Sequence, residues 1–135
     1  MDDLAAIDRL LRRYADVMTR QAWDELDDVV TTGAQLTFEL PGGRTREVVG
    51  PEELAAFGAA AVGQFAFYEY LPSNNVVSLL DGDRAEGRAS CVEVGQAADG
   101  SWTDFFGHYD DEYVKCDGRW RIASRRYRCV ALRRR

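Results

Sequence analysis

The amino-acid sequence predicts an α+β fold, with helices gathered on one face of a curved antiparallel sheet. Apolar residues recur at helical spacing near the start of the chain, whereas apolar and polar residues alternate over most of residues 67–131. Because helix-like segments come first and strand-like segments cluster later, the helices should form one layer against the sheet. We expect residues 1–135 to form a single domain.

The first helix is predicted from an apolar stripe, with Asp2 and Asp3 suited to its positive N-terminal end. The stripe consists of Leu4, Ile7, Leu10, Leu11, Tyr14, Val17 and Met18. After a break at residues 19–21, the helical pattern resumes in a second short helix that continues through Val30 and ends at Gly33.

Residues 34–49 are predicted to form a β-hairpin that turns at Pro41-Gly42-Gly43. A further helix should begin at Pro51, because proline is favoured in the first turn and two glutamates follow it.

Four strands are predicted after this helix, separated by the turn sequences DGD, ADG and CDG. They cover residues 67–80, 84–96, 102–115 and 119–131, and short turns between them indicate an antiparallel meander. Long strands that curl around helices leave a concave interior, where we expect a small apolar ligand or substrate to bind.

The net charge of −6 argues against a nucleic-acid partner, which would require a dominant basic surface. The run Arg133-Arg134-Arg135 is the exception, and we expect it to be a solvated tail. No stretch approaches the roughly 18 apolar residues of a membrane-spanning helix, so no membrane partner is expected.

The chain has three cysteines and one histidine, His108, without the spacing of a metal site. We therefore expect no metal and no cofactor. The first residues lack the basic and apolar regions of an export signal, which with the odd number of cysteines favours a cytoplasmic protein.

Four segments carry a family resemblance: YADVMTRQAWDELDDVV, FELPGGRTREVVGPEELAAF, NNVVSLLDGDRAEG and GHYDDEYVKCDGRWRIASRR. In this order, they resemble the SnoaL-like branch of the nuclear transport factor 2-like superfamily. That group includes polyketide cyclases, scytalone dehydratase, a hexachlorocyclohexane dehydrochlorinase and small subunits of ring-hydroxylating dioxygenases. The resemblance implies a cone-shaped barrel with an apolar pocket.

Dehydratase and dehydrochlorinase members of this group use an Asp–His dyad as a general base. The resemblance places Thr19 at the aspartate position. With Asn75 taken as the asparagine of the His-x-x-x-Asn motif, it places Leu71 at the histidine position. Neither side chain can abstract a proton at neutral pH, so the dyad chemistry is not expected here.

Glu93 is the candidate to replace the dyad as acid or base. The family pattern and the alternation of the strand direct Ala89, Cys91 and Glu93 inward, where burial would raise the pKa of the carboxyl toward neutrality. The alternative is a register shifted by one residue, which would leave Glu93 in solvent.

Asp111 and Arg125 match a carboxylate and an arginine near the pocket of the dehydrochlorinase-like members. They could form a cross-strand ion pair that polarises a substrate oxygen, or a purely structural salt bridge. Trp120 and Ile122 look like core residues of the opposite strand parity, so Arg125 can face inward only if a bulge or strong twist intervenes.

Tyr14 could donate a hydrogen bond into the cone, or could be a core tyrosine with a local partner. Further pocket walls are expected from side chains that would equally be needed to fill a core: Met18, Phe38, Phe57, Phe67, Leu71, Cys91, Phe105 and Tyr109. His108 is expected to face outward.

These features favour a cofactor-independent enzyme of the cyclase, isomerase or dehydratase type, acting on an apolar or polyketide-like substrate by acid–base chemistry. The alternatives are a non-catalytic ligand-binding or assembly module of the same fold, and a small subunit of a ring-hydroxylating oxygenase. A homodimer formed through the outer face of the sheet is the expected assembly.

Overall fold

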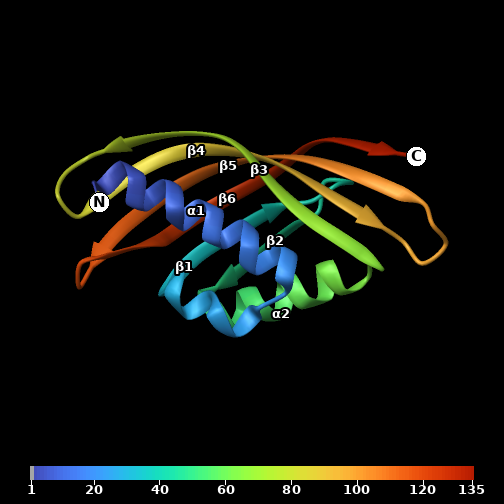
Figure 1. Cartoon of the computed structure of the whole chain (residues 1–135), viewed down its shortest axis with the longest axis horizontal. Helices are drawn as coiled ribbons and strands as arrows, with labels where there is room; N and C mark the ends of the chain where they lie inside the picture. The colour runs from blue at the N-terminus through green and yellow to red at the C-terminus, as the bar shows by residue number, and fades with distance from the viewer. Residues whose placement is uncertain (1) are drawn as a thin grey trace.

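A computed structural model describes residues 2–135 and shows two α-helices, a 3₁₀ helix and one curved six-stranded sheet (Figure 1). The elements follow in the order α1 (Asp3–Arg20), η1 (Trp23–Asp28), β1 (Val30–Glu39), β2 (Thr45–Val49), α2 (Gly50–Gly63), β3 (Phe67–Leu79), β4 (Arg84–Gln96), β5 (Trp102–Cys116) and β6 (Arg119–Arg134). The α+β prediction is confirmed.

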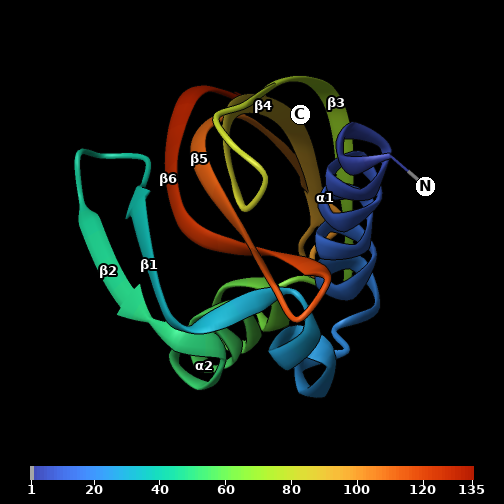
Figure 2. The same ribbon diagram turned by 90° about the vertical axis from the view of Figure 1, so that its left-hand side faces the viewer.

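The strands are ordered β2-β1-β6-β5-β4-β3 across the sheet. All neighbouring strands are antiparallel except β1 and β6, and β3 to β6 form the predicted meander. Figure 2 shows the sheet curving around an interior that α1 closes along β3, while α2 lies near β1 and η1. No helix among residues 2–135 combines the length and apolarity needed to cross a membrane.

Helix α1 forms because its apolar stripe is buried and both of its ends are capped. The Asp2 side chain accepts a hydrogen bond from the Ala5 amide at 2.8 Å, and Gln21 adopts a left-handed conformation with φ of 56° at the other end. The stripe, which includes Ile7, Tyr14 and Val17, faces the concave side of the sheet.

The second predicted helix is shorter than its sequence pattern suggested. η1 ends at Asp28, and Val30 and Gly33 belong to β1, so their assignment to this helix was wrong. The physical reason is sheet pairing: the Ile122 amide donates to the Val29 carbonyl oxygen at 2.9 Å, and Val30 pairs with Ile122. Pairing with β6 outweighs the local helical pattern.

The C-terminal arginines are exposed, as expected, but they do not form a free tail, and that part of the prediction was wrong. β6 continues to Arg134, and the guanidinium groups of Arg133 and Arg135 both reach Asp104 on β5, at 2.8 Å and 3.2 Å. Asp104 is 2% exposed beneath them, and hydrogen bonds from Arg133 and then Arg135 lower the pKa of its carboxyl. The two arginines close over Asp104 because side chains two positions apart share one face of a strand.

A β-bulge in β6 resolves the parity conflict around Arg125. Glu112 pairs with Ser124 but Tyr113 pairs with Ile122, so β6 contains one more residue, Ala123, than β5 over this stretch. The extra residue lets Ile122 and Arg125 both face the interior.

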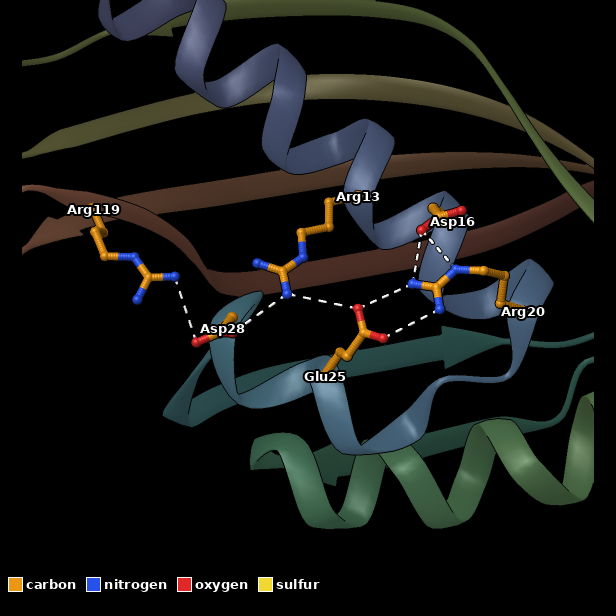
Figure 3. A network of polar contacts seen from close by, with 6 residues as sticks. All are labelled: Arg13, Asp16, Arg20, Glu25, Asp28 and Arg119. Atoms are coloured by element: carbon orange, nitrogen blue, oxygen red, sulfur yellow. Dashed lines mark hydrogen bonds and ion pairs between the residues drawn. The ribbon is translucent and has the colours of Figure 1, made fainter.

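Six charged residues form a network on the surface that joins α1, η1 and the start of β6 (Figure 3). Arg20 bridges Asp16 at 2.8 Å and Glu25 at 3.0 Å. Asp28 forms ion pairs with Arg13 at 3.3 Å and with Arg119 at 3.4 Å. This surface network ties η1 to the elements on either side of it.

Candidate active site

The interior between α1 and strands β3 to β6 is lined by a cluster of tyrosines around two acids and an arginine. We call this set the interior cluster: Tyr14, Tyr68, Tyr70, Glu93, Tyr109, Asp111 and Arg125. The tyrosine rings pack edge to face or tilted, with centroids 5.8 Å apart for Tyr14 and Tyr70 and 6.3 Å apart for Tyr14 and Tyr109. All six tyrosines of the chain are buried, so the interior combines aromatic surface with phenol groups.

Asp111 and Arg125 form a buried ion pair across β5 and β6. Arg125 Nε donates to Asp111 Oδ1 at 2.8 Å and Nη2 donates to Oδ2 at 3.2 Å, while the Tyr113 hydroxyl donates to Oδ2 at 2.7 Å. The Arg125 side chain is 2% exposed and the Asp111 side chain 0%. The bidentate geometry and the third donor offset part of the cost of burying two charges.

The Arg125 guanidinium lies between two aromatic rings. Its Cζ is 3.5 Å from the Tyr109 ring centroid and 4.5 Å from that of Tyr14, within cation–π range. Burial alone would lower the pKa of Arg125, but Asp111 and the surrounding phenols raise it well above its usual value, so the group stays charged. Its remaining nitrogen, Nη1, is buried and has no hydrogen-bond partner among residues 2–135.

Glu93 lies on the interior face of β4, as the strand alternation predicts. It pairs with Tyr70 on β3 and Phe105 on β5, and its Oε2 accepts a hydrogen bond from the Tyr68 hydroxyl at 2.9 Å. The side chain is half-buried. Loss of water raises the pKa of the carboxyl, against the opposing effects of the Tyr68 hydrogen bond and the Arg125 charge.

Groups beside Glu93 are held in their neutral forms. Burial and the nearby Glu93 charge raise the pKa of Tyr68, and the same two causes raise the pKa of Cys91 to about 12. Burial raises the pKa of Tyr14 to about 12, although the Arg125 charge opposes it. Near neutral pH these groups therefore act as hydrogen-bond donors, and Glu93 is the group in this part of the interior suited to exchange a proton.

Thr19 has a structural role at the end of α1. Its hydroxyl oxygen accepts a hydrogen bond from the Tyr70 amide at 3.0 Å and lies 3.5 Å from the Tyr70 carbonyl oxygen. β3 is an edge strand, so Thr19 satisfies backbone groups that no neighbouring strand can reach.

Leu71 does not line the interior, and its predicted place there was wrong. Its side chain is 42% exposed, and the interior position beside Thr19 belongs to Tyr70. A bulge explains the displacement: Pro72 pairs with Cys91 and Asn75 with Ala89, so β3 carries one extra residue between them. The dyad remains absent, because Thr19 and Tyr70 are neither a carboxylate nor an imidazole.

The other predicted wall residues divide into two groups. Met18, Phe38, Cys91 and Tyr109 are buried, and half-buried Phe57 stacks on Phe38 with centroids 4.3 Å apart. Half-buried Phe105 packs against Phe65 beside Glu93, at 6.0 Å between centroids.

The prediction for Phe67 was wrong. It is 45% exposed and packs against Trp102, because strand alternation assigns the interior positions to Tyr68 and Tyr70. Those two tyrosines were missed as site residues, although their spacing of two within one strand was the signal that could have identified them. His108 is exposed, as expected.

Two hollows border the sheet. One, of about 30 Å³, lies between α1 and the bulged part of β3 and reaches Arg125. The other, of about 510 Å³, is an open groove on the outer face, lined by charged and small residues of β3 to β6. Within the part of the chain that the structure describes, no three histidine, cysteine, aspartate or glutamate side chains converge as a metal site would require.

The SnoaL-like domain family model matches residues 1–126. The chain belongs to the SnoaL-like family. A curated relative, the uncharacterized protein Rv2910c of Mycobacterium tuberculosis, is 28% identical over 127 residues, covering 93% of this chain and 84% of that protein.

Solved structures agree with this assignment. The Kfla4162 protein of Kribbella flavida superposes with a TM-score of 0.85 at 26% identity, over 97% of this chain and 93% of that one. A hexachlorocyclohexane dehydrochlorinase, LinA-type3 of Novosphingobium barchaimii, gives 0.84 at 18% identity, over 97% and 88%. A proposed scytalone dehydratase of Novosphingobium aromaticivorans gives 0.85 at 17% identity, over 97% and 86%. At these lower identities the likeness shows a shared fold.

Proposed function

We propose that this SnoaL-like protein is a cofactor-independent enzyme that moves a proton on a small apolar or polyketide-like substrate, in a cyclisation, isomerisation or dehydration. The observation that carries the proposal is the desolvated Glu93 carboxyl, which has a raised pKa and a hydrogen bond from Tyr68. An acid–base group is most effective when its pKa lies near the working pH, and burial moves Glu93 in that direction.

The remaining groups have supporting roles. Arg125, kept charged by Asp111, stabilises negative charge that develops on a substrate oxygen, and Tyr14 lies against the same guanidinium. Phe57 and Phe105 are half-buried beside the interior and offer apolar contact to a substrate. Two of the similar structures carry the names dehydrochlorinase and, as a proposed assignment, scytalone dehydratase, and reactions of these two types fit a proton-removing carboxylate.

The test uses 5-nitrobenzisoxazole, a small aromatic compound whose ring opens when a base removes one carbon-bound proton. The wild-type protein is expected to accelerate this opening with saturation, and Glu93→Gln to lower the rate by about 10²-fold or more. The matched control is Glu47→Gln on β2, an exposed glutamate remote from the interior, which should retain the wild-type rate. An equal rate in the Glu93→Gln variant would remove Glu93 from the mechanism.

A second candidate is a binding module without turnover, favoured by Thr19 in its structural role at the family's aspartate position. It predicts that native mass spectrometry detects a co-purified apolar ligand while 5-nitrobenzisoxazole and further elimination substrates are left unchanged. Rate acceleration that depends on Glu93 would exclude this candidate.

We also propose that two copies pair through the outer face of the sheet. Phe67, Leu71 and Val76 on β3 are 45%, 42% and 52% exposed, which leaves apolar surface for a second copy to cover. Light scattering should give twice the monomer mass, and Leu71→Glu should reduce it to the monomer. A monomeric wild-type protein would contradict the pairing.

A further inference from the structure

The small hollow beside α1, which we call the seam cavity, leads from the surface to Arg125. It has a volume of about 30 Å³, and its walls include Asp8 and Arg12 from α1, Asn75 from β3, Ala89 from β4 and Arg125 from β6. A cavity of this size admits only about one or two water-sized groups. Any larger ligand would insert one end and leave the rest in the open part of the seam.

Arg125 lines the seam cavity and has one donor that is not used. The side chain is 2% exposed, its Nε and Nη2 donate to Asp111, and its buried Nη1 has no partner among the residues that the structure describes. The rings of Tyr109 and Tyr14 hold the guanidinium in place, so Nη1 cannot turn away to find an acceptor elsewhere. A buried N–H of this kind binds an acceptor that enters the cavity.

The charges around the seam cavity favour a neutral acceptor over an anion. Arg125 is paired with Asp111, and Arg12 is paired with Asp8 at 2.9 Å, so each arginine already faces one carboxylate. A second carboxylate or a halide would add negative charge that no further cation in this set balances, and would lose its own hydration. A carbonyl oxygen accepts the same hydrogen bond without adding a charge.

We propose that the seam cavity binds the carbonyl oxygen of the substrate through Arg125 Nη1, so that the substrate class is a ketone or aldehyde. The role of this carbonyl contact in turnover rests on the proposed function. A guanidinium bound to a carbonyl oxygen makes the neighbouring C–H groups more acidic, and that is the kind of proton a carboxylate base removes. The charge of Arg125 also opposes the effect of burial on the pKa of Glu93.

Asn75 and Asp8 both line the seam cavity, and a hydrogen bond from Asn75 Nδ2 to Asp8 Oδ1 at 3.1 Å joins them. Asn75 follows the β3 bulge, and Asp8 is also bonded to Arg12. Because Asn75 lines the seam cavity, its backbone amide should report on a ligand that enters.

The test is an NMR titration with three probes: cyclohexanone, methylenecyclohexane of matching shape, and the smaller anion acetate. Cyclohexanone should shift the Arg125 side-chain signals and the Asn75 amide with saturation. Methylenecyclohexane, which has the same shape but no acceptor, should leave them unchanged, and acetate should bind more weakly than the ketone. Tighter binding of acetate than of cyclohexanone would overturn the carbonyl assignment.

Two variants locate the binding. Arg125→Lys keeps a cation beside Asp111 but removes Nη1, and Ala89→Val narrows the cavity. Each should weaken cyclohexanone binding roughly tenfold, the effect of one lost hydrogen bond. Thermal melting checks that each variant is folded, and Ala89→Val alone decides the test if Arg125→Lys is not. Unchanged affinity in Ala89→Val would overturn the proposal.

Glu93→Gln separates this inference from the proposed function, because binding is measured without turnover. The variant should bind cyclohexanone with wild-type affinity. Ketone binding without Glu93-dependent proton transfer would contradict the proposed chemistry alone, and Glu93-dependent proton transfer without ketone binding would contradict the seam cavity alone.

Discussion

The surface network of Figure 3 and the interior cluster both contain arginine–carboxylate pairs with similar distances, yet their surroundings differ. Arg20 and Glu25 are 3.0 Å apart with side chains 47% and 36% exposed, whereas Arg125 and Asp111 are 2.8 Å apart with side chains 2% and 0% exposed. Water and salt screen the first pair, whereas the second pair is almost entirely shielded from bulk solvent.

The difference shows where this protein uses charge for stability and where it uses charge for chemistry. In the surface network each arginine faces one or two carboxylates, and exposed pairs of this kind contribute roughly 0–1 kcal/mol. In the interior, burial makes every missing partner costly, yet Arg125 Nη1 is left unbonded among residues 2–135. This donor is therefore available to an acceptor that enters the seam cavity.

The largest effect is expected from breaking the interior pair. Arg125→Met would leave Asp111 buried and charged with only the Tyr113 hydroxyl as a donor, at a cost of about 3–5 kcal/mol in the free energy of unfolding. Urea denaturation measures this loss.

The double variant Arg125→Met/Asp111→Leu provides the control, because replacing both charges with apolar groups should recover much of that loss. A single variant as stable as the wild type would show that the interior pair is solvated like the surface pairs.

Glu93 should make stability depend on pH in the opposite direction to the surface acids. The pKa of Glu93 is higher in the folded protein than its value near 4.5 in the unfolded chain, so the unfolded chain releases the proton at lower pH. The free energy of unfolding therefore falls as the pH rises from about 4.5 to the folded pKa. Glu93→Gln should remove this fall and be relatively more stable at pH 7 than at pH 4. Melting temperatures across that range measure it, and parallel curves for both proteins would contradict the raised pKa.

Substitution of Thr19 should cause a smaller loss of stability than breaking the interior pair. Thr19 is adjacent in sequence to Arg20 of the surface network. Thr19→Val keeps the shape but removes the hydroxyl that serves the Tyr70 backbone, so the free energy of unfolding should fall by about 1 kcal/mol. Hydrogen exchange should speed up at the Tyr70 amide in particular. An unchanged exchange rate at the Tyr70 amide would show that the Thr19 hydroxyl does not protect it.

Arg20→Met should have the smallest effect, because all its partners are exposed. Hydrogen bonds from Arg20 lower the pKa of Glu25, so this pair stabilises the fold above the unfolded pKa of the glutamate and loses that effect as pH falls through the lower folded value. The small loss of melting temperature should disappear in about 1 M salt, where the Debye length is about 3 Å. A loss that persists in salt would show that the surface network is packed more tightly than its exposure indicates.

The sequence carries enough information for the element order and the meander, because these follow from periodicity within segments and from the turns between them. The inward direction of Glu93 needed the family pattern as well, because alternation alone does not say which of its two faces is buried. It does not reveal bulges, since one inserted residue leaves the local pattern intact while reversing every side chain beyond it. Leu71 and the parity of Arg125 were both affected in this way. Contacts between side chains far apart in the sequence were equally hidden, as Arg133 and Asp104 show.

The additional residue at position 123 affects the shape of the last strand more than the direction of its side chains. Deleting Ala123 would leave Ile122 and Arg125 two positions apart, still opposite Tyr113 and Asp111 and still facing the interior. The strand would lose the local bend and the added twist that a bulge produces. Homologues that lack this residue should therefore keep the same interior side chains on a straighter final strand.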